Sequence, residues 1–162
     1  MWWKVCTDIP SVTRFIFNFT QMKKHQFLLK NLDDLPSVSK EFLNTIENHT
    51  IFAFSGDMGA GKTTFILGVL KAMGIEETNG SPTYSLINEY ESKDFGNVYH
   101  FDVYRLKNSM EALDFGIDEI FESGGYCFIE WPEKIENLLP NNTIWVYLRR
   151  NEANECIISF EL

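Results

Sequence analysis

Apolar and polar positions along the chain form segments that predict helices and strands in a mixed α/β order. Two segments, 35–48 and 62–73, carry apolar residues on one face at helical spacing. Between and after them lie apolar runs of strand length. The predicted strands cover 25–30, 51–55, 84–90, 98–103, 126–129, 143–148 and 155–160. Helices and strands alternate early and strands dominate late, which indicates one α/β domain with a mixed, partly antiparallel central sheet flanked by helices.

Glycine and proline mark the ends of several predicted elements. Gly74 follows the second helix at the position of its expected C′ residue. The segment 110–121 has a helical pattern that is broken around Gly116. Pro132 is expected to open a further short helix, because proline suits the first helical turn. Residues 92–97 separate two predicted strands by a turn, so that strand pair is predicted to be a hairpin.

The length of 162 residues is typical of one domain. Hydrophobic residues make up 44% of the chain, which is enough for a sizeable core. We expect residues 22–162 to form the domain and residues 1–21 to be an N-terminal extension, because Met22-Lys23-Lys24 resembles an ordinary start followed by a strand. No apolar run reaches the roughly 18 residues of a membrane-spanning helix. The extension also lacks a signal-peptide cleavage site, so a cytoplasmic protein is expected.

The charge and the cysteine pattern narrow the classes of function. Lys and Arg number 14 and Asp and Glu number 23, which gives a formal net charge of −9. This charge balance argues against direct binding to nucleic acid, which needs clustered basic residues. Action on nucleic acid through a partner protein stays open. Three widely spaced cysteines and no CxxC pair argue against a disulfide framework or a structural zinc site.

The strongest local signal is a glycine-rich loop between the strand 51–55 and the helix 62–73. Its residues Gly56-Asp57-Met58-Gly59-Ala60-Gly61-Lys62-Thr63 match the phosphate-binding pattern G-x-x-x-x-G-K-[ST] at every fixed position. Glycines let successive backbone N–H groups face phosphate oxygens, and the helix N-terminus adds positive dipole. We expect Lys62 to reach the β- and γ-phosphates and the Thr63 hydroxyl to bind Mg²⁺. The guanine-reading motif N-K-x-D is absent, which favours an adenine nucleotide.

Two acids, Asp102 and Glu130, stand at the ends of later apolar runs. A nucleotide site of this kind needs a carboxylate at a nearby strand end, to hold Mg²⁺ or to orient water. Either acid alone is equally compatible with a solvent-facing strand end. Ser81 and Thr83 lie in a polar loop after the P-loop helix, where a hydroxyl is able to sense a γ-phosphate. Composition alone favours a simple turn there.

Four segments in this order resemble the successive motifs of the TsaE family, the ATPase component of bacterial tRNA threonylcarbamoyladenosine synthesis. They are residues 56–64, 81–83, 100–106 and 129–133. A P-loop occurs in many families, whereas H-x-D-x-Y-R followed by E-W-P is far more specific. The resemblance extends from about residue 22 to the C-terminus and implies a single-domain P-loop NTPase fold.

The resemblance also implies slow ATP hydrolysis that is coupled to a TsaB–TsaD pair. In that assembly TsaD performs the carbamoyl transfer to adenosine 37 of tRNA, and the ATPase resets the assembly between turnovers. Contact with tRNA is then indirect, through the complex, and no membrane is involved.

The resemblance assigns roles to the motif residues. The loop and Thr64 bind the nucleotide, with Lys62 and Thr63 on phosphate and Mg²⁺. Glu130 is the second protein ligand of the metal and Asp102 orients or deprotonates water, although the two acids remain interchangeable. Lys62, Asp102 and Glu130 are thus the expected catalytic residues.

Two further motif segments receive roles in the same way. Ser81 and Thr83 belong to a loop that responds to the γ-phosphate, and Trp131 supports Glu130 or meets a partner. One departure concerns the last hairpin, where relatives often carry Gly-Arg and this chain has Asn154-Glu155. A nucleotide contact from that hairpin would need Arg149 or Arg150 instead.

Two other classes of function compete with a coupled ATPase. A small-molecule kinase on a P-loop scaffold usually needs an arginine-bearing lid, and this chain has four arginines and no obvious lid insertion. A nucleotide-dependent binding module without turnover is the second alternative. The presence of both acids favours hydrolysis over that module.

Overall fold

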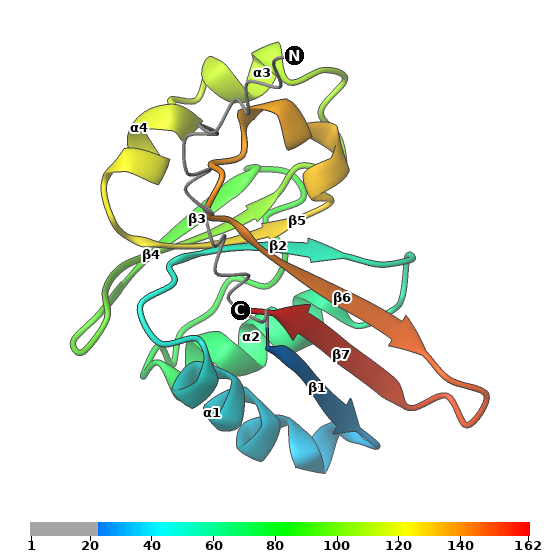
Figure 1. The fold of residues 1–162 in the computed structure, drawn as a ribbon. Helices are drawn as coiled ribbons and strands as arrows, with labels where there is room; N and C mark the ends of the chain where they lie inside the picture. The colour runs from blue at the N-terminus through cyan, green and yellow to red at the C-terminus, as the bar shows by residue number, and fades with distance from the viewer. Residues whose placement is uncertain (1–22) are drawn as a thin grey trace, which may run out of the picture.

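The computed structural model describes residues 23–162, so the expected N-terminal extension 1–21 lies outside the described residues. Within the described part, seven strands form one mixed sheet in the order β1-β7-β6-β2-β5-β4-β3 (Figure 1). The strands are β1 (Lys24–Leu29), β2 (Ile51–Ser55), β3 (Ile87–Ser92), β4 (Gly96–Asp102), β5 (Tyr126–Glu130), β6 (Ile144–Arg150) and β7 (Cys156–Glu161). The central strands β6, β2, β5 and β4 are mutually parallel, and the outer strands pair antiparallel. The predicted mixed α/β fold is confirmed.

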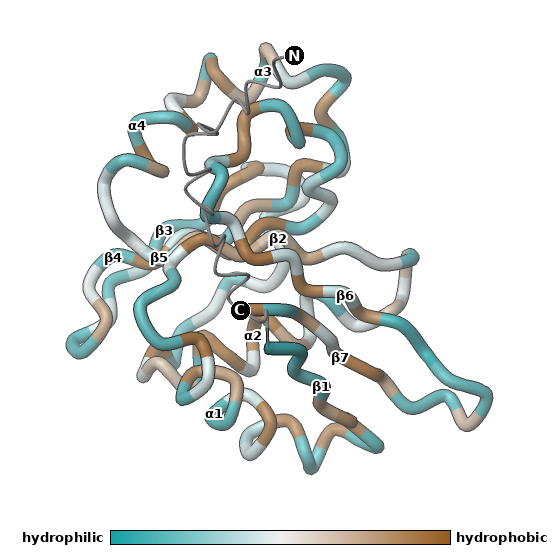
Figure 2. The backbone as a smooth tube through the Cα atoms, in the orientation of Figure 1, coloured by the Kyte–Doolittle hydropathy of each residue, from teal (hydrophilic) through white to brown (hydrophobic). Residues whose placement is uncertain are grey.

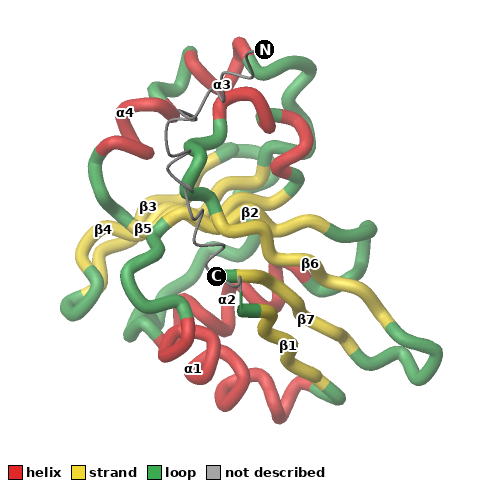
Figure 3. The backbone as a smooth tube through the Cα atoms, viewed as in Figure 1, coloured by secondary structure: helices red, strands yellow, loops and turns green. Residues whose placement is uncertain are grey.

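Helices cover both faces of this sheet (Figure 3). On one face lie α1 (Leu35–Thr45) and α2 (Lys62–Ala72), and on the other lie α3 (Met110–Leu113) and α4 (Ile117–Glu122). Short 3-10 turns cover Leu32–Asp34, Pro132–Lys134 and Glu136–Leu138, so the short helix expected at Pro132 is present in this form. Among residues 23–162, none of the helices has the length and apolar character required to cross a membrane.

The glycine predicted at the end of α2 has the expected role. Gly74 has φ +82° and its N–H donates to the carbonyl of Lys71 at 3.0 Å. The N–H of Ile75 reaches back to the carbonyl of Leu70, also at 3.0 Å, which completes a Schellman motif. Gly116, with φ +69°, separates α3 from α4, as the broken helical pattern predicts.

The strand predicted at 84–90 is displaced, because β3 begins only at Ile87. Residues 83–86 form a turn instead, in which the N–H of Leu86 donates to the carbonyl of Pro82 at 2.6 Å. Leu86 has φ +66°, a conformation that cannot continue a strand. The hairpin itself is confirmed, since β3 and β4 pair antiparallel across a short turn.

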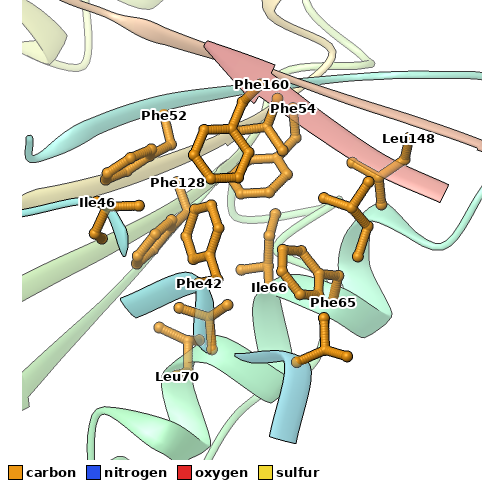
Figure 4. Packing of buried hydrophobic residues seen from close by; sticks show 14 of the residues in the cluster. Phe42, Ile46, Phe52, Phe54, Phe65, Ile66, Leu70, Phe128, Leu148 and Phe160 are labelled. Atoms are coloured by element: carbon orange, nitrogen blue, oxygen red, sulfur yellow. The ribbon is translucent and has the colours of Figure 1, made fainter. Parts of the chain in front are cut away.

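Each face of the sheet has its own hydrophobic cluster, and Figure 2 shows hydrophobic residues concentrated in the strands and their covering helices. The cluster under α1 and α2 is rich in phenylalanine (Figure 4): Phe42, Phe52, Phe54, Phe65, Phe128 and Phe160. Side chains of β5 alternate between the clusters, because Phe128 joins this one while Cys127 and Ile129 join the cluster under α3 and α4. The ring centroid of Phe65 in α2 lies 6.2 Å from the ring centroid of Phe54 in β2. This packing fixes α2 against β2, and hence both ends of the loop between them.

Candidate functional site

Strands β2, β4 and β5 end at the same edge of the sheet, and their register brings the two candidate acids together. Asp102 pairs with Glu130 across β4 and β5, and Glu130 pairs with Phe54 across β5 and β2. Asp102 is 5% exposed and Glu130 is 3% exposed. Neither acid is therefore a solvent-facing strand end, and both lie beside the start of the glycine-rich loop.

The glycines of the loop are required by its path. A Cβ atom added at Gly56 would lie 2.3 Å from the carbonyl oxygen of Leu148 in β6, so only glycine allows this approach. Gly59 and Gly61 have φ of +80° and +112°, which L side chains rarely adopt. Gly61 directly precedes the first turn of α2. The loop thus wraps the N-terminus of α2, an arrangement that binds phosphate groups.

Lys62 is buried inside this loop and is 4% exposed. Its Nζ donates to the carbonyl oxygens of Gly56 at 2.5 Å and Asp57 at 3.0 Å, and lies 3.7 Å from the ring centroid of Trp131. Burial lowers the pKa of Lys62, and four nearby carboxylates oppose this shift: Glu130, Glu133, Asp102 and Asp57. Charged acceptors form stronger hydrogen bonds than carbonyls, so a phosphate oxygen in the loop is a better partner for this ammonium.

Glu130 joins the loop to the sheet through two side chains. The Thr63 hydroxyl lies 2.9 Å and 2.8 Å from its two carboxylate oxygens. The Nε2 atom of His100, which is fully buried, lies 2.8 Å from Oε1 of Glu130. A carboxylate only accepts, so Nε2 carries the proton and donates. Hydroxyl and carboxylate oxygens are the ligand types that Mg²⁺ prefers, so this donor set fits that ion.

Asp102 holds the loop that contains Ser81 and Thr83. Both hydroxyls donate to its Oδ2 atom, at 2.5 Å and 2.7 Å respectively. Its Oδ1 atom accepts from the backbone N–H of Tyr104 at 3.2 Å. In the structure both hydroxyl groups therefore bind Asp102. The turn that composition favoured is also present, at residues 83–86.

The predicted site residues gather around one cavity of about 410 Å³, and all except Gly56, Asp57 and Ala60 line it. Gly56 instead packs against β6, and the side chain of Ala60 is buried. A larger hollow of about 660 Å³ beside β1, β6 and β7 contains none of the predicted site residues.

Four further residues line the cavity beside those assigned to the nucleotide, the metal or catalysis: Tyr104, Arg105, Trp131 and Arg150. The rings of Tyr104 and Trp131 lie 4.9 Å apart, and Trp131 has φ +62°. Between Arg149 and Arg150, the structure places the second at the loop, with Nε donating to the Gly59 carbonyl at 3.3 Å. The sequence could have distinguished Arg150 from Arg149, because side chains alternate along a strand and Arg150 lies on the same face of β6 as the buried Leu148.

His100 is the other functional residue that sequence reasoning did not assign. It lies two positions before Asp102 in β4, and hence on the same face of the sheet. A histidine within a buried apolar strand needs a partner, and the partner here is Glu130. That pairing depends on the register of β4 against β5.

Comparisons with known proteins show which family the chain is similar to. A family model described as "Threonylcarbamoyl adenosine biosynthesis protein TsaE" matches residues 29–157. The tRNA threonylcarbamoyladenosine biosynthesis protein TsaE of Bacillus subtilis (strain 168) is 33% identical over 139 residues, which cover 86% of each chain. The TsaE protein of Rickettsia bellii (strain RML369-C) is 36% identical over 130 residues, 80% of this chain and 89% of that protein. The crystal structure of Bacillus subtilis YdiB aligns with a TM-score of 0.69 and 29% identity, covering 86% of each chain. The chain therefore belongs to the TsaE family.

Proposed function

We propose that this chain is a Mg²⁺-dependent ATPase that serves the threonylcarbamoylation of tRNA adenosine 37 in the cytoplasm. The observation that carries the proposal is the contact of Thr63, at the end of the phosphate loop, with the buried Glu130 carboxylate. The similarity to TsaE proteins supports the pathway, since those relatives are named for threonylcarbamoyladenosine biosynthesis.

In this proposal the loop and Lys62 hold the β- and γ-phosphates. The ammonium group exchanges its neutral carbonyl acceptors, Gly56 and Asp57, for phosphate oxygens. Thr64 and the backbone of Gly59 and Gly61 line the same cavity and complete the phosphate contacts.

Thr63 and Glu130 are the residues that would hold the metal ion. When bound, Mg²⁺ supplies positive charge against the β- and γ-phosphate oxygens. The Thr63 hydroxyl donates its hydrogen bond to Glu130, which leaves an oxygen lone pair of Thr63 for a cation. His100 donates to Oε1 of Glu130 and so fixes the orientation of the carboxylate.

Asp102 is the residue proposed to act on water. Its carboxylate already accepts three hydrogen bonds, from Ser81, Thr83 and the N–H of Tyr104, and a carboxylate has about four acceptor positions. The remaining position is available to a water molecule. The water oxygen bonds to the γ-phosphorus, the bond to the β–γ bridging oxygen breaks with its electron pair left on ADP, and the water proton passes to Asp102.

TsaB and TsaD are the proposed partners, and this chain contacts tRNA only indirectly, through the complex with them. The net charge of −9 favours docking on a basic protein surface and disfavours independent binding to RNA. Slow turnover alone and faster turnover with the pair are expected. A docked complex that is insensitive to both salt and tRNA would contradict the electrostatic part of the proposal.

The decisive experiment measures phosphate release from Mg·ATP by the full chain, alone and with TsaB and TsaD. Lys62→Ala is the test variant, and Lys71→Ala, an exposed lysine of the same helix, is the matched control. Stimulation by the pair that is lost only in Lys62→Ala supports the proposal. Tight ATP binding without stimulated turnover would favour a binding module, and transfer of phosphate to a metabolite would favour a kinase.

A further inference from the structure

Among the described residues, three basic side chains line the cavity, and Arg105 differs from the other two. Lys62 donates to carbonyls of the phosphate loop, and Arg150 donates to the carbonyls of Gly59 and Asn154. Within residues 23–162, Arg105 has neither a hydrogen bond nor an ion pair. Its guanidinium lies over the ring of Tyr84, 4.3 Å from the centroid. Arg105 is therefore a cation at the cavity that is held by no polar group of the described part of the chain.

The two residues of the Arg105–Tyr84 contact come from segments that adjoin Asp102 and the loop bound to it. Arg105 follows the end of β4 by three residues, and Tyr84 directly follows Thr83, whose hydroxyl donates to Asp102. Tyr84 is 88% exposed. An exposed cation–π contact changes a population by only about two- to fivefold, so little free energy opposes the departure of Arg105 from this ring.

We propose that Arg105 is a catalytic arginine of the ATPase, and that Tyr84 keeps it at the rim of the cavity in the free protein. This inference rests on the function proposed above. The planar guanidinium fork matches two phosphate oxygens, whereas a lysine offers a single point charge. Placed on the γ-phosphoryl oxygens, Arg105 stabilises the charge that develops as the bond to the β–γ bridging oxygen breaks and the water oxygen bonds to phosphorus.

The position of Tyr84 gives the stacked pair a role in partner stimulation. The Tyr84 ring is exposed, so a partner protein that docks at this side of the cavity is able to cover the ring and displace it from Arg105. Arg105 then moves from the rim to the phosphate. The stacked arrangement then lowers turnover by the free chain by about two- to fivefold.

The test compares kcat and KM for ATP, with and without TsaB and TsaD, in Arg105→Ala, Arg105→Lys and Tyr84→Ala. Arg149→Ala, an exposed arginine that does not line the cavity, is the control. We expect Arg105→Ala to lower stimulated kcat by roughly a thousandfold with little change in KM, and Arg105→Lys to rescue it poorly. Tyr84→Ala is expected to raise partner-free kcat about two- to fivefold, and only when Arg105 is present.

A second measurement does not depend on turnover. Arg105→Ala should bind ADP like the unchanged chain but lose the added affinity that aluminium fluoride gives to ADP, because that complex mimics the transferring phosphoryl group. Stimulated kcat within about tenfold of the unchanged chain, together with full affinity for ADP–aluminium fluoride, would overturn the inference alone. Absence of hydrolysis by the unchanged chain with its partners would overturn the proposed function and this inference together.

Discussion

His100 Nε2 donates to Oε1 of Glu130 across 2.8 Å, and both side chains are buried where β4 and β5 end. The same carboxylate accepts from Thr63 at the start of α2. Glu130 therefore connects a central strand pair to the phosphate loop, and its orientation depends on a residue outside the loop. Removing the imidazole leaves a buried carboxylate with one donor fewer, which is a costly state for a charged group.

His100→Phe should lower the free energy of unfolding by about 3 kcal/mol, because Glu130 loses a buried donor. The measurement is equilibrium urea unfolding, with His49→Phe as the control that should change the value by less than about 0.5 kcal/mol. The variant should also lose the tightening of nucleotide binding by Mg²⁺. Unchanged stability in His100→Phe would show that the imidazole does not support Glu130.

Asp102→Asn should leave ATP affinity nearly unchanged and should reduce hydrolysis by about a hundredfold or more. The phosphate contacts belong to the loop on the other side of the cavity, whereas the amide cannot take a proton from water. Titration calorimetry measures the affinity and phosphate release measures the rate. Asp94→Asn, in the exposed turn between β3 and β4, is the control, and full activity of Asp102→Asn would refute the proposed role.

Gly56→Ala should destabilise the fold by about 2–3 kcal/mol, because the new Cβ would meet the Leu148 carbonyl oxygen. Gly124→Ala is the control, because it imposes the cost of a positive φ on alanine without a steric clash. Gly124 has φ +78° but an added Cβ there meets no atom within 4 Å, so about 1 kcal/mol is expected. Thermal and urea unfolding of the two variants compare these costs, and equal losses would exclude the clash as the cause.

The stability of the fold should decline above pH 9 through Cys127. Burial raises the pKa of the Cys127 thiol from 9.0 to about 12. Above pH 9 the unfolded chain releases this proton while the folded chain keeps it, so the free energy of unfolding falls by at most about 1.4 kcal/mol per pH unit. Cys127→Ala should show a shallower fall than the unchanged chain in urea unfolding between about pH 8 and about pH 10. Parallel slopes for the two proteins would contradict this prediction.

Local patterns predicted the parts of the site that lie within one element. The phosphate loop is contiguous, and its fixed positions identify Lys62 and Thr63 directly. Asp102 and Glu130 could be predicted from the sequence, because each stands at the end of an apolar run. The strand 84–90 was misplaced because a positive φ at Leu86 has no signature in apolar alternation. The turn there depends on contacts with the rest of the fold.

Contacts between distant elements explain what the pattern did not reveal. The pairing of His100 with Glu130 requires the register of two strands. The stacking of Arg105 on Tyr84 requires two loops to meet beside β4. No spacing along the chain encodes either distance, because both depend on how separate segments are aligned in the folded sheet.

The direct pairing of Asp102 with Glu130 across β4 and β5 also bears on how the chain can vary in evolution. The connection that carries α3 and α4 runs between these strands without setting the separation of the two carboxylates. Insertions or deletions are tolerable for the site in the part of that connection that follows Arg105, because Tyr104 and Arg105 themselves line the cavity. Loss of a single residue inside β5 would turn Glu130 to the opposite face of the sheet. Selection on length should therefore be strict from β4 to Arg105 and within β5, and relaxed in the rest of the connection.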